Sequence, residues 1–237
     1  MRFLGTAALG LLVVCSLSAC GQQGGEASGG ASSSAPAEVG GCTVAAFDAA
    51  SGEVGEVGTS SGTVEVKLPT QGPCAGRLVA RGESGVVGLT VSGLDGSTAQ
   101  VVPLDATGED APQALVRVDG EPHPRGGFQP HLFTVTDEVR ELTVGGSPLV
   151  PFVATDGGMA PMTATCTTDG GVAVLTATTS EPPGVVLAWD VERTTYAVTA
   201  TGAEETGTEQ VRDHAADPVL REEMPALFEP GALFADC

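Results

Sequence analysis

Short apolar stretches separated by turn-forming residues dominate the chain from residue 42 onward. The sequence has 34 glycines and 16 prolines among its 237 residues, which favours many turns and short elements over long helices. Apolar and polar residues alternate most clearly in residues 63–68, where Val64, Val66 and Leu68 would share one face. Aromatic residues make up only 4% of the chain, so a core must consist mainly of Val, Leu and Ala. These features predict a mainly β protein built of antiparallel sheets, either sandwich-like or partial-propeller-like.

The expected strands follow one another along the chain with turns between them. They cover residues 63–68, 86–91, 99–104, 115–119, 132–136, 139–144, 149–154, 163–167, 172–178, 185–191 and 194–201. Asp95-Gly96 suits a tight turn, which predicts that 86–91 and 99–104 form a hairpin. The apolar run 185–189 is typical of a central strand buried on both faces. One short C-terminal helix is expected, with Asp217 as its N-cap and Pro225 limiting its length.

The first twenty residues have the order of a bacterial export signal. Arg2 supplies a short positive region, residues 3–14 are mainly apolar, and Leu17-Ser18-Ala19-Cys20 follows with Gly21 behind it. This segment resembles the lipobox of bacterial lipoproteins. The resemblance implies that Cys20 is diacylglyceryl-modified, that residues 1–19 are removed as a signal peptide, and that Cys20 becomes the new N-terminus. Two acyl chains, at about 0.8 kcal/mol per buried methylene, would hold a domain firmly at the membrane.

Two other interpretations of this segment stay open: a secretory signal that ends at Ala19, with Cys20 as a disulfide partner, and a transmembrane anchor.

After Cys20, residues 21–41 consist mostly of Gly, Ser and Ala and predict a flexible, disordered tether with an r.m.s. span of roughly 25 Å. The chain has no Asn, no Ile and a single lysine, Lys67, a bias that resembles lipoproteins of high-GC Gram-positive bacteria. The expected location is therefore the extracytoplasmic face of the cell membrane, with the lipid as anchor.

Four cysteines follow Cys20, and their even number in an exported protein suggests disulfides with three possible pairings. They are Cys42, Cys74, Cys166 and Cys237. We expect the pairs Cys42–Cys74 and Cys166–Cys237, because each would close a segment within one half of the chain. Asp156-Gly157-Gly158 marks the boundary between these halves, so the expected β subdomains are residues 42–155 and 156–237.

The charge of the chain limits its partners. Thirty acidic residues against ten basic ones give a formal net charge of −20, and removing Arg2 with the signal would make it −21. Binding to phosphates requires Lys and Arg, so we expect no nucleic-acid partner and no polybasic membrane patch. The expected partners are the membrane, through the lipid, and a protein or glycan ligand of unknown identity.

Few residues point to catalysis. His123, His131 and His214 lack a metal-binding spacing, but two of them converging with a carboxylate would indicate an anchored, metal-assisted hydrolase. Ser84 lies in Gly82-Glu83-Ser84-Gly85, which lacks the first glycine of G-x-S-x-G. The sequence therefore assigns no catalytic and no cofactor-binding residues. It favours a binding or envelope-interaction module, with a hydrolase as the alternative.

One acidic loop resembles the FG-GAP or VCBS-type repeat, in which a D-x-D-G-D-G-x-x-D loop leads into an apolar strand. Asp105, Thr107 and Glu109 match the first three ligand positions, whereas Asp110 replaces a glycine and Gln113 replaces the last acid. The resemblance implies a Ca²⁺ site at these three residues. Because two carboxylates of the motif are missing, an acidic β-turn without metal is the interpretation that we favour.

Overall fold

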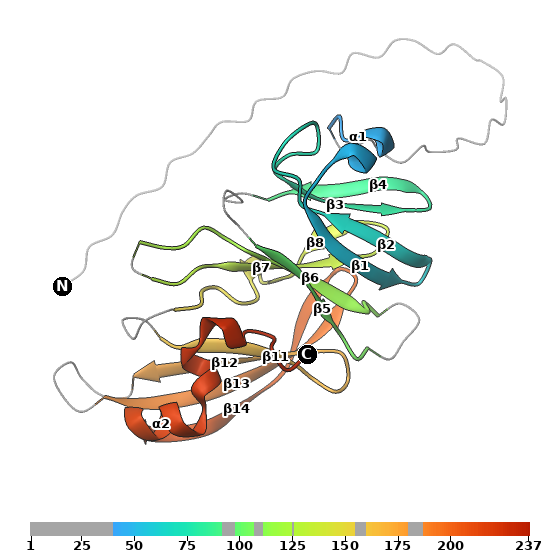
Figure 1. Cartoon of the computed structure of the whole chain (residues 1–237). Helices are drawn as coiled ribbons and strands as arrows, with labels where there is room; N and C mark the ends of the chain where they lie inside the picture. Colours follow the sequence, from blue (N-terminus) through green and yellow to red (C-terminus); the bar gives the residue numbers. More distant parts are fainter. Residues whose placement is uncertain (1–39, 92–97, 107–110, 125, 155–159, 180–186) are drawn as a thin grey trace, which may run out of the picture. The chain divides into compact units, whose positions relative to one another are not determined.

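Three four-stranded antiparallel sheets follow one another along the chain (Figure 1). The computed structural model describes residues 40–91, 98–106, 111–124, 126–154, 160–179 and 187–237. Residues 1–39, which hold the expected signal peptide, Cys20 and most of the tether, lie outside this part of the chain, as does Asp156-Gly157-Gly158. No helix of the described residues is long and apolar enough to cross a membrane.

In each four-stranded sheet, every strand pairs with the next strand in the sequence. Sheet A contains β1 (Glu53–Thr59), β2 (Gly62–Lys67), β3 (Arg77–Gly82) and β4 (Gly85–Thr90). Sheet B contains β5 (Ala99–Pro103), β6 (Ala114–Asp119), β7 (Pro130–Val135) and β8 (Val139–Glu141). Sheet C contains β11 (Met162–Cys166), β12 (Val172–Thr179), β13 (Ala188–Thr199) and β14 (Gly202–Ala216). A small hairpin, β9 (Thr143–Val144) with β10 (Ser147–Pro148), follows sheet B. The expected mainly β, antiparallel fold is confirmed.

The predicted hairpin between residues 86–91 and 99–104 is wrong. Strand β4 pairs with β3 in sheet A, whereas β5 pairs with β6 in sheet B, so the chain changes sheets between β4 and β5. The Asp95-Gly96 turn itself lies outside the described residues. A turn dipeptide favours a local reversal but does not decide which flanking strands pair, because pairing also depends on the face that each strand buries.

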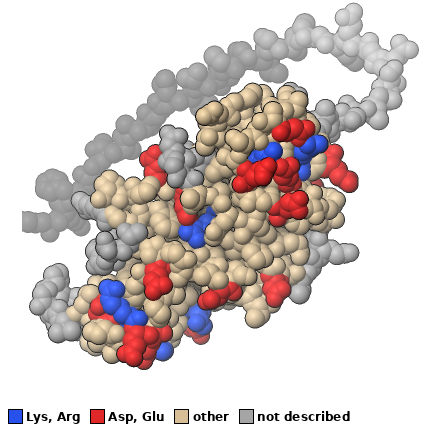
Figure 2. Space-filling model, viewed as in Figure 1, with Lys and Arg blue, Asp and Glu red and all other residues tan. Residues whose placement is uncertain are grey.

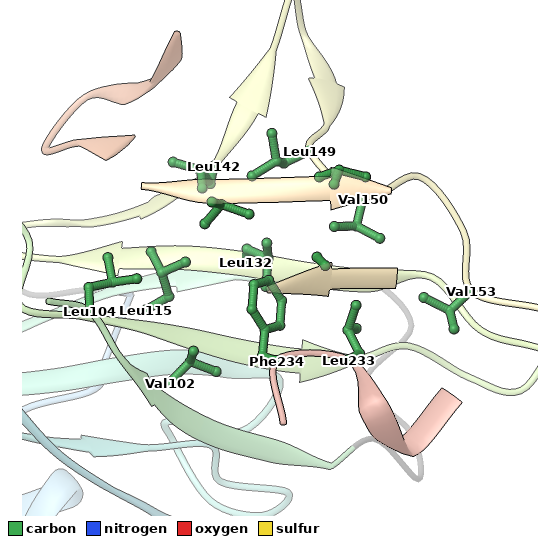
Figure 3. Close-up of a cluster of buried hydrophobic side chains, with 13 residues drawn as sticks. Val102, Leu104, Leu115, Leu132, Leu142, Leu149, Val150, Val153, Leu233 and Phe234 are labelled. Carbon is green, nitrogen blue, oxygen red and sulfur yellow. The ribbon is translucent and has the colours of Figure 1, made fainter. Parts of the chain in front are cut away.

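The strands buried on both faces belong to sheet B. Val116 of β6 and Phe133 of β7 pack with the apolar side chains of sheet A. Their neighbours Leu115 and Leu132 point to the opposite face and join a second core with residues of sheet C and the C-terminal tail (Figure 3). All four side chains are at most 2% exposed. Sheet B is therefore the middle layer between two cores.

The expected two-sided burial of residues 185–189 is only partly present. Strand β13 is central in sheet C, since it pairs with β12 and β14, but burial is strongest at its start, in Ala188, Trp189 and Val191. Leu187, just before the strand, is 37% exposed, and residues 185–186 lie outside the described part. Residues 149–154, expected as a strand, contribute only an isolated bridge between Val153 and Phe128. The buried side chains of residues 149–154 therefore belong to a loop and not to a strand.

The described residues form two α-helices, one expected and one not. Helix α1 (Val44–Ala49) was not predicted; Thr43 caps it by accepting a hydrogen bond from the backbone N–H of Ala46 at 3.2 Å. Helix α2 (Asp217–Glu223) begins as expected, but its N-cap is Ala216, and Asp217 is the first helical residue. The predicted N-cap role of Asp217 is therefore wrong, because its carboxylate binds Trp189 and Arg221 instead. Pro225 ends α2 as expected and begins the 3₁₀ helix η1 (Pro225–Phe228), which η2 (Pro230–Ala232) follows.

The carboxylate of Asp217 joins sheet C to helix α2. It accepts a hydrogen bond from Trp189 Nε1 at 2.9 Å and one from Arg221 Nε at 2.8 Å. Burial raises the pKa of Asp217, but these two donors outweigh it and hold the pKa below its usual value. The ionised carboxylate therefore stabilises the folded state at neutral pH.

We expect Asp217→Asn to lower the free energy of unfolding at pH 7 by about 2 kcal/mol, because charged hydrogen bonds are lost. In the wild type this contribution disappears as pH falls through the lowered pKa of the folded state, so the difference between the two proteins should vanish in strong acid. The difference in the free energy of unfolding is measured by urea unfolding, followed by the fluorescence of Trp189, the only tryptophan. A difference that stays constant from pH 7 to pH 2 would contradict this account.

Both expected disulfides are present. Cys42 is joined to Cys74 with their Cα atoms 4.7 Å apart, and Cys166 is joined to Cys237 at 5.4 Å. The core in Figure 3 includes residues of both proposed subdomains, for example Leu149 from the first and Leu233 from the second. The segments 42–155 and 156–237 therefore share apolar packing.

Candidate functional site

The three histidines each have a different setting. His131 Nδ1 lies 2.8 Å from Glu141 Oε1, with both side chains mostly buried. The ring of His123 contacts Phe152 edge to face, and the backbone N–H of His214 donates to Asp190 at 2.8 Å. Within the described residues, no group of three His, Cys, Asp or Glu side chains is arranged to hold a metal ion. The convergence of two histidines with a carboxylate, which would have favoured a hydrolase, is not found there.

Of the three residues proposed for Ca²⁺, only Asp105 lies in the described part, and Thr107 and Glu109 lie outside it. Asp105 follows strand β5 and lines a surface hollow of about 290 Å³ together with Asp236, Thr167 and the disulfide Cys166–Cys237. Its side chain is exposed. The structure therefore places Asp105 beside a polar hollow, and the expected Ca²⁺ site at the three residues stays a prediction.

A second hollow lies where three hairpin turns meet. The turns join β1 to β2, β3 to β4 and β7 to β8, so two belong to sheet A and one to sheet B. We call this the turn hollow, and its volume is about 160 Å³. It is lined by Ser61, Val64, Ala80, Gly82, Glu83, Ser84, Gly85, Val87, Thr136 and Asp137. Buried Val64 and Ala80 supply apolar surface, while the turn residues supply hydroxyls and carboxylates.

Four of the five polar side chains that line the turn hollow make no polar contact with the described part of the protein. Within the described residues, Glu83, Ser84, Thr136 and Asp137 have no side-chain hydrogen bond or ion pair to another residue. Ser61 lies 3.1 Å from Thr59 Oγ1. Ligand sites commonly combine apolar surface with a few polar groups that fix orientation. The turn hollow therefore has acceptors and hydroxyls available for a ligand, and none of its described lining residues is basic.

A third hollow, of about 270 Å³, lies on sheet C beside η1. Leu175, Met224 and Leu227 give it apolar walls. Two of its three charged groups have partners within the protein: Arg193 pairs with Glu209 at 2.8 Å, and Glu223 pairs with Arg212 at 2.9 Å, whereas Asp236 has no such pair among the described residues. This groove therefore has fewer unpaired groups for recognition than the turn hollow.

The surface has more acidic than basic groups, in line with the net charge of −20. On the face shown in Figure 2, the blue basic patches lie beside red acidic ones, whereas several red patches have no blue neighbour. Such a field raises the local concentration of cations and repels anions within about 10 Å of the surface at 0.1 M salt. A positively charged ligand is favoured on electrostatic grounds.

Sequence reasoning missed most of the turn hollow. Ser84 was considered only as a hydrolase nucleophile, and the structure places it in the turn between β3 and β4. Glu83, Thr136 and Asp137 carried no motif that separates them from ordinary turn residues. Comparison of the chain with known protein families, curated proteins and solved structures found no match.

Proposed function

We propose that this chain is a lipid-anchored extracytoplasmic binding protein that takes up a small polar ligand at the turn hollow. The observation that carries the anchor is Leu17-Ser18-Ala19-Cys20, which follows an apolar run and precedes a Gly-, Ser- and Ala-rich segment. Acylated Cys20 would hold the protein at the membrane, and residues 21–41 would separate the lipid from the folded domain.

The contacts of residues 40–42 support an attachment of the expected tether, residues 21–41, to the folded domain. The guanidinium of Arg77 donates to the carbonyl of Gly40 at 3.1 Å and to that of Pro73 at 3.0 Å. Two residues further on, Cys42 forms its disulfide with Cys74. The disulfide and the Arg77 hydrogen bond would therefore fix the start of the folded domain next to sheet A. Without such contacts, a terminal segment is usually poorly ordered.

The ligand chemistry follows from the turn hollow. Hydroxyls of Ser84 and Thr136 suit a polyhydroxylated ligand, and the two unpaired carboxylates of Glu83 and Asp137 suit an ammonium group. An amino sugar carries both kinds of group, and its ring can rest on the apolar surface of Val64 and Val87. We therefore propose an amino sugar, free or within a glycan, as the ligand class.

The test compares glucosamine with glucose, which differ at one position by an ammonium group in place of a hydroxyl. The full chain should bind glucosamine at least about tenfold more tightly, because a charge-assisted hydrogen bond is added. Asp137→Asn should bring the two affinities together, whereas Glu138→Gln in the same turn should leave them unchanged, since Glu138 pairs with Arg140. Calorimetry measures both affinities. Equal binding of the two sugars, or no binding of either, would reject this ligand class.

A further inference from the structure

The two disulfides differ sharply in their surroundings. Cys42 and Cys74 are 1% and 0% exposed and pack in an apolar cluster with Phe47, Val79 and Val86. Cys166 and Cys237 are only partly buried, and both line the hollow that contains Asp105 and Asp236. This hollow, which we call the disulfide hollow, has a volume of about 290 Å³. A small thiol can therefore reach Cys166–Cys237 in the folded protein, whereas Cys42–Cys74 is buried and inaccessible.

We propose that Cys166–Cys237 is a thiol–disulfide exchange site for small thiols that carry no negative charge. The site lies where β11 meets the C-terminal tail, at the end of sheet C (Figure 1). The proposal does not depend on the lipid anchor or on the amino sugar.

The hydrogen bonding around the disulfide favours one direction of attack. The backbone N–H of Cys166 donates to Cys237 Sγ at 3.0 Å. A hydrogen bond of this kind stabilises the thiolate of Cys237 and makes it the better leaving group. The incoming thiolate attacks Cys166 Sγ and forms a new S–S bond there. The bond to Cys237 breaks and its electron pair stays on Cys237, which leaves as a thiolate, so charge is conserved; the incoming sulfur is oxidised, Cys237 is reduced, and no further oxidant or reductant is needed.

Charge around the disulfide selects the thiol. Asp105 and Asp236 line the same hollow as the two sulfur atoms. None of the described residues that line it is basic, so an anionic thiolate that carries a second negative charge is repelled. At low salt each carboxylate should slow such a thiol about two- to threefold relative to one without that charge, and added salt should reduce the difference.

Opening the Cys166–Cys237 disulfide should leave the C-terminal tail packed against the domain. Leu233 and Phe234 are 1% and 5% exposed and belong to the core shown in Figure 3. The backbone N–H of Phe234 donates to the carbonyl of Ala164 at 2.8 Å, and Arg117 donates to the carbonyl of Leu233 at 2.9 Å. These contacts hold the tail against β11 after the disulfide opens. Exchange therefore frees the thiol of Cys237 while the rest of the tail stays docked.

The experiment treats the folded full chain with 2-mercaptoethanol, which is neutral, and with 2-mercaptoethanesulfonate, which is anionic, at equal thiolate concentrations. Free thiols are trapped by alkylation and located by peptide mass mapping, which separates these cysteines from Cys15 and Cys20. The neutral thiol should form an adduct on Cys166 with Cys237 free, at least about a hundredfold faster than any reaction at Cys42–Cys74, whose opening requires unfolding. The same reactions in urea correct for the intrinsic reactivity of each thiol.

Two variants test the role of charge. Asp236→Asn should raise the rate of the anionic thiol about two- to threefold and change that of the neutral thiol little. Glu56→Gln removes the same charge from an exposed position on sheet A and should alter neither rate. Equal rates at the two disulfides, an adduct on Cys237, or no reaction in the folded protein would overturn the proposal.

Discussion

Cys20→Ala should move the protein entirely from the detergent phase to the aqueous phase in detergent partitioning of cells that express the full chain. The lipobox interpretation gives Cys20 the only attachment to the membrane, because the strongly acidic domain is repelled by anionic head groups. Each acyl chain contributes about 0.8 kcal/mol per buried methylene. Loss of the lipid should therefore abolish membrane binding completely and not merely weaken it.

Cys15→Ala provides the matched control for this experiment. Cys15 lies five residues before Cys20 and would be removed with the signal peptide, so its replacement should leave partitioning unchanged. The intact mass of the wild-type protein should show the loss of residues 1–19 and the gain of acyl groups on Cys20. A Cys20→Ala protein that remains in the detergent phase would contradict the lipid anchor and favour a transmembrane segment.

The alternation of apolar residues predicted those strands whose burial is strong. Residues 115–119 and 132–136 became β6 and β7, which have nearly continuous buried side chains in sheet B. Strand β14 was missed because its pattern is mostly polar: residues 204–210 are all exposed, and register shifts interrupt its pairing with β13. Its formation depends on its neighbour β13, which the sequence of β14 alone does not reveal. Charged side chains and bulges on this edge also hinder pairing with other chains.

The candidate site was harder to predict than the fold for a physical reason. The turn hollow combines three turns, around Ser61, Ser84 and Thr136, and these are far apart in the sequence. Only the packing of sheet A on sheet B, through residues such as Val66 and Phe133, brings them together. Turn residues are polar for reasons of backbone geometry, so their polarity carries little information about ligands. The disulfide pairs, in contrast, were expected because each closes a segment within one half of the chain, and both are present.

Arg117→Met should lower the free energy of unfolding by about 3–5 kcal/mol, as is typical when one partner of a buried ion pair is removed. The side chain of Arg117 comes from β6 and is 8% exposed. Its guanidinium donates to both carboxylate oxygens of Asp119, at 2.6 and 2.9 Å, and to the carbonyl of Leu233 at 2.9 Å. The ring of Phe128 lies 5.5 Å from it. Methionine fills similar space but leaves Asp119 and the tail carbonyl without their donor.

Arg140→Met is the control, because Arg140 also pairs with a carboxylate two residues away. Its partner Glu138 lies 2.5 Å from it, but the two side chains are 48% and 62% exposed, so this variant should change stability by no more than about 0.5 kcal/mol. Urea unfolding with both disulfides intact, followed by the fluorescence of Trp189, measures all variants. Arg117→Met combined with Asp119→Asn should recover part of the loss, since the second change removes the unpaired charge and keeps an acceptor for Thr98. Equal effects of Arg117→Met and Arg140→Met would show that the buried pair does not hold the tail to sheet B.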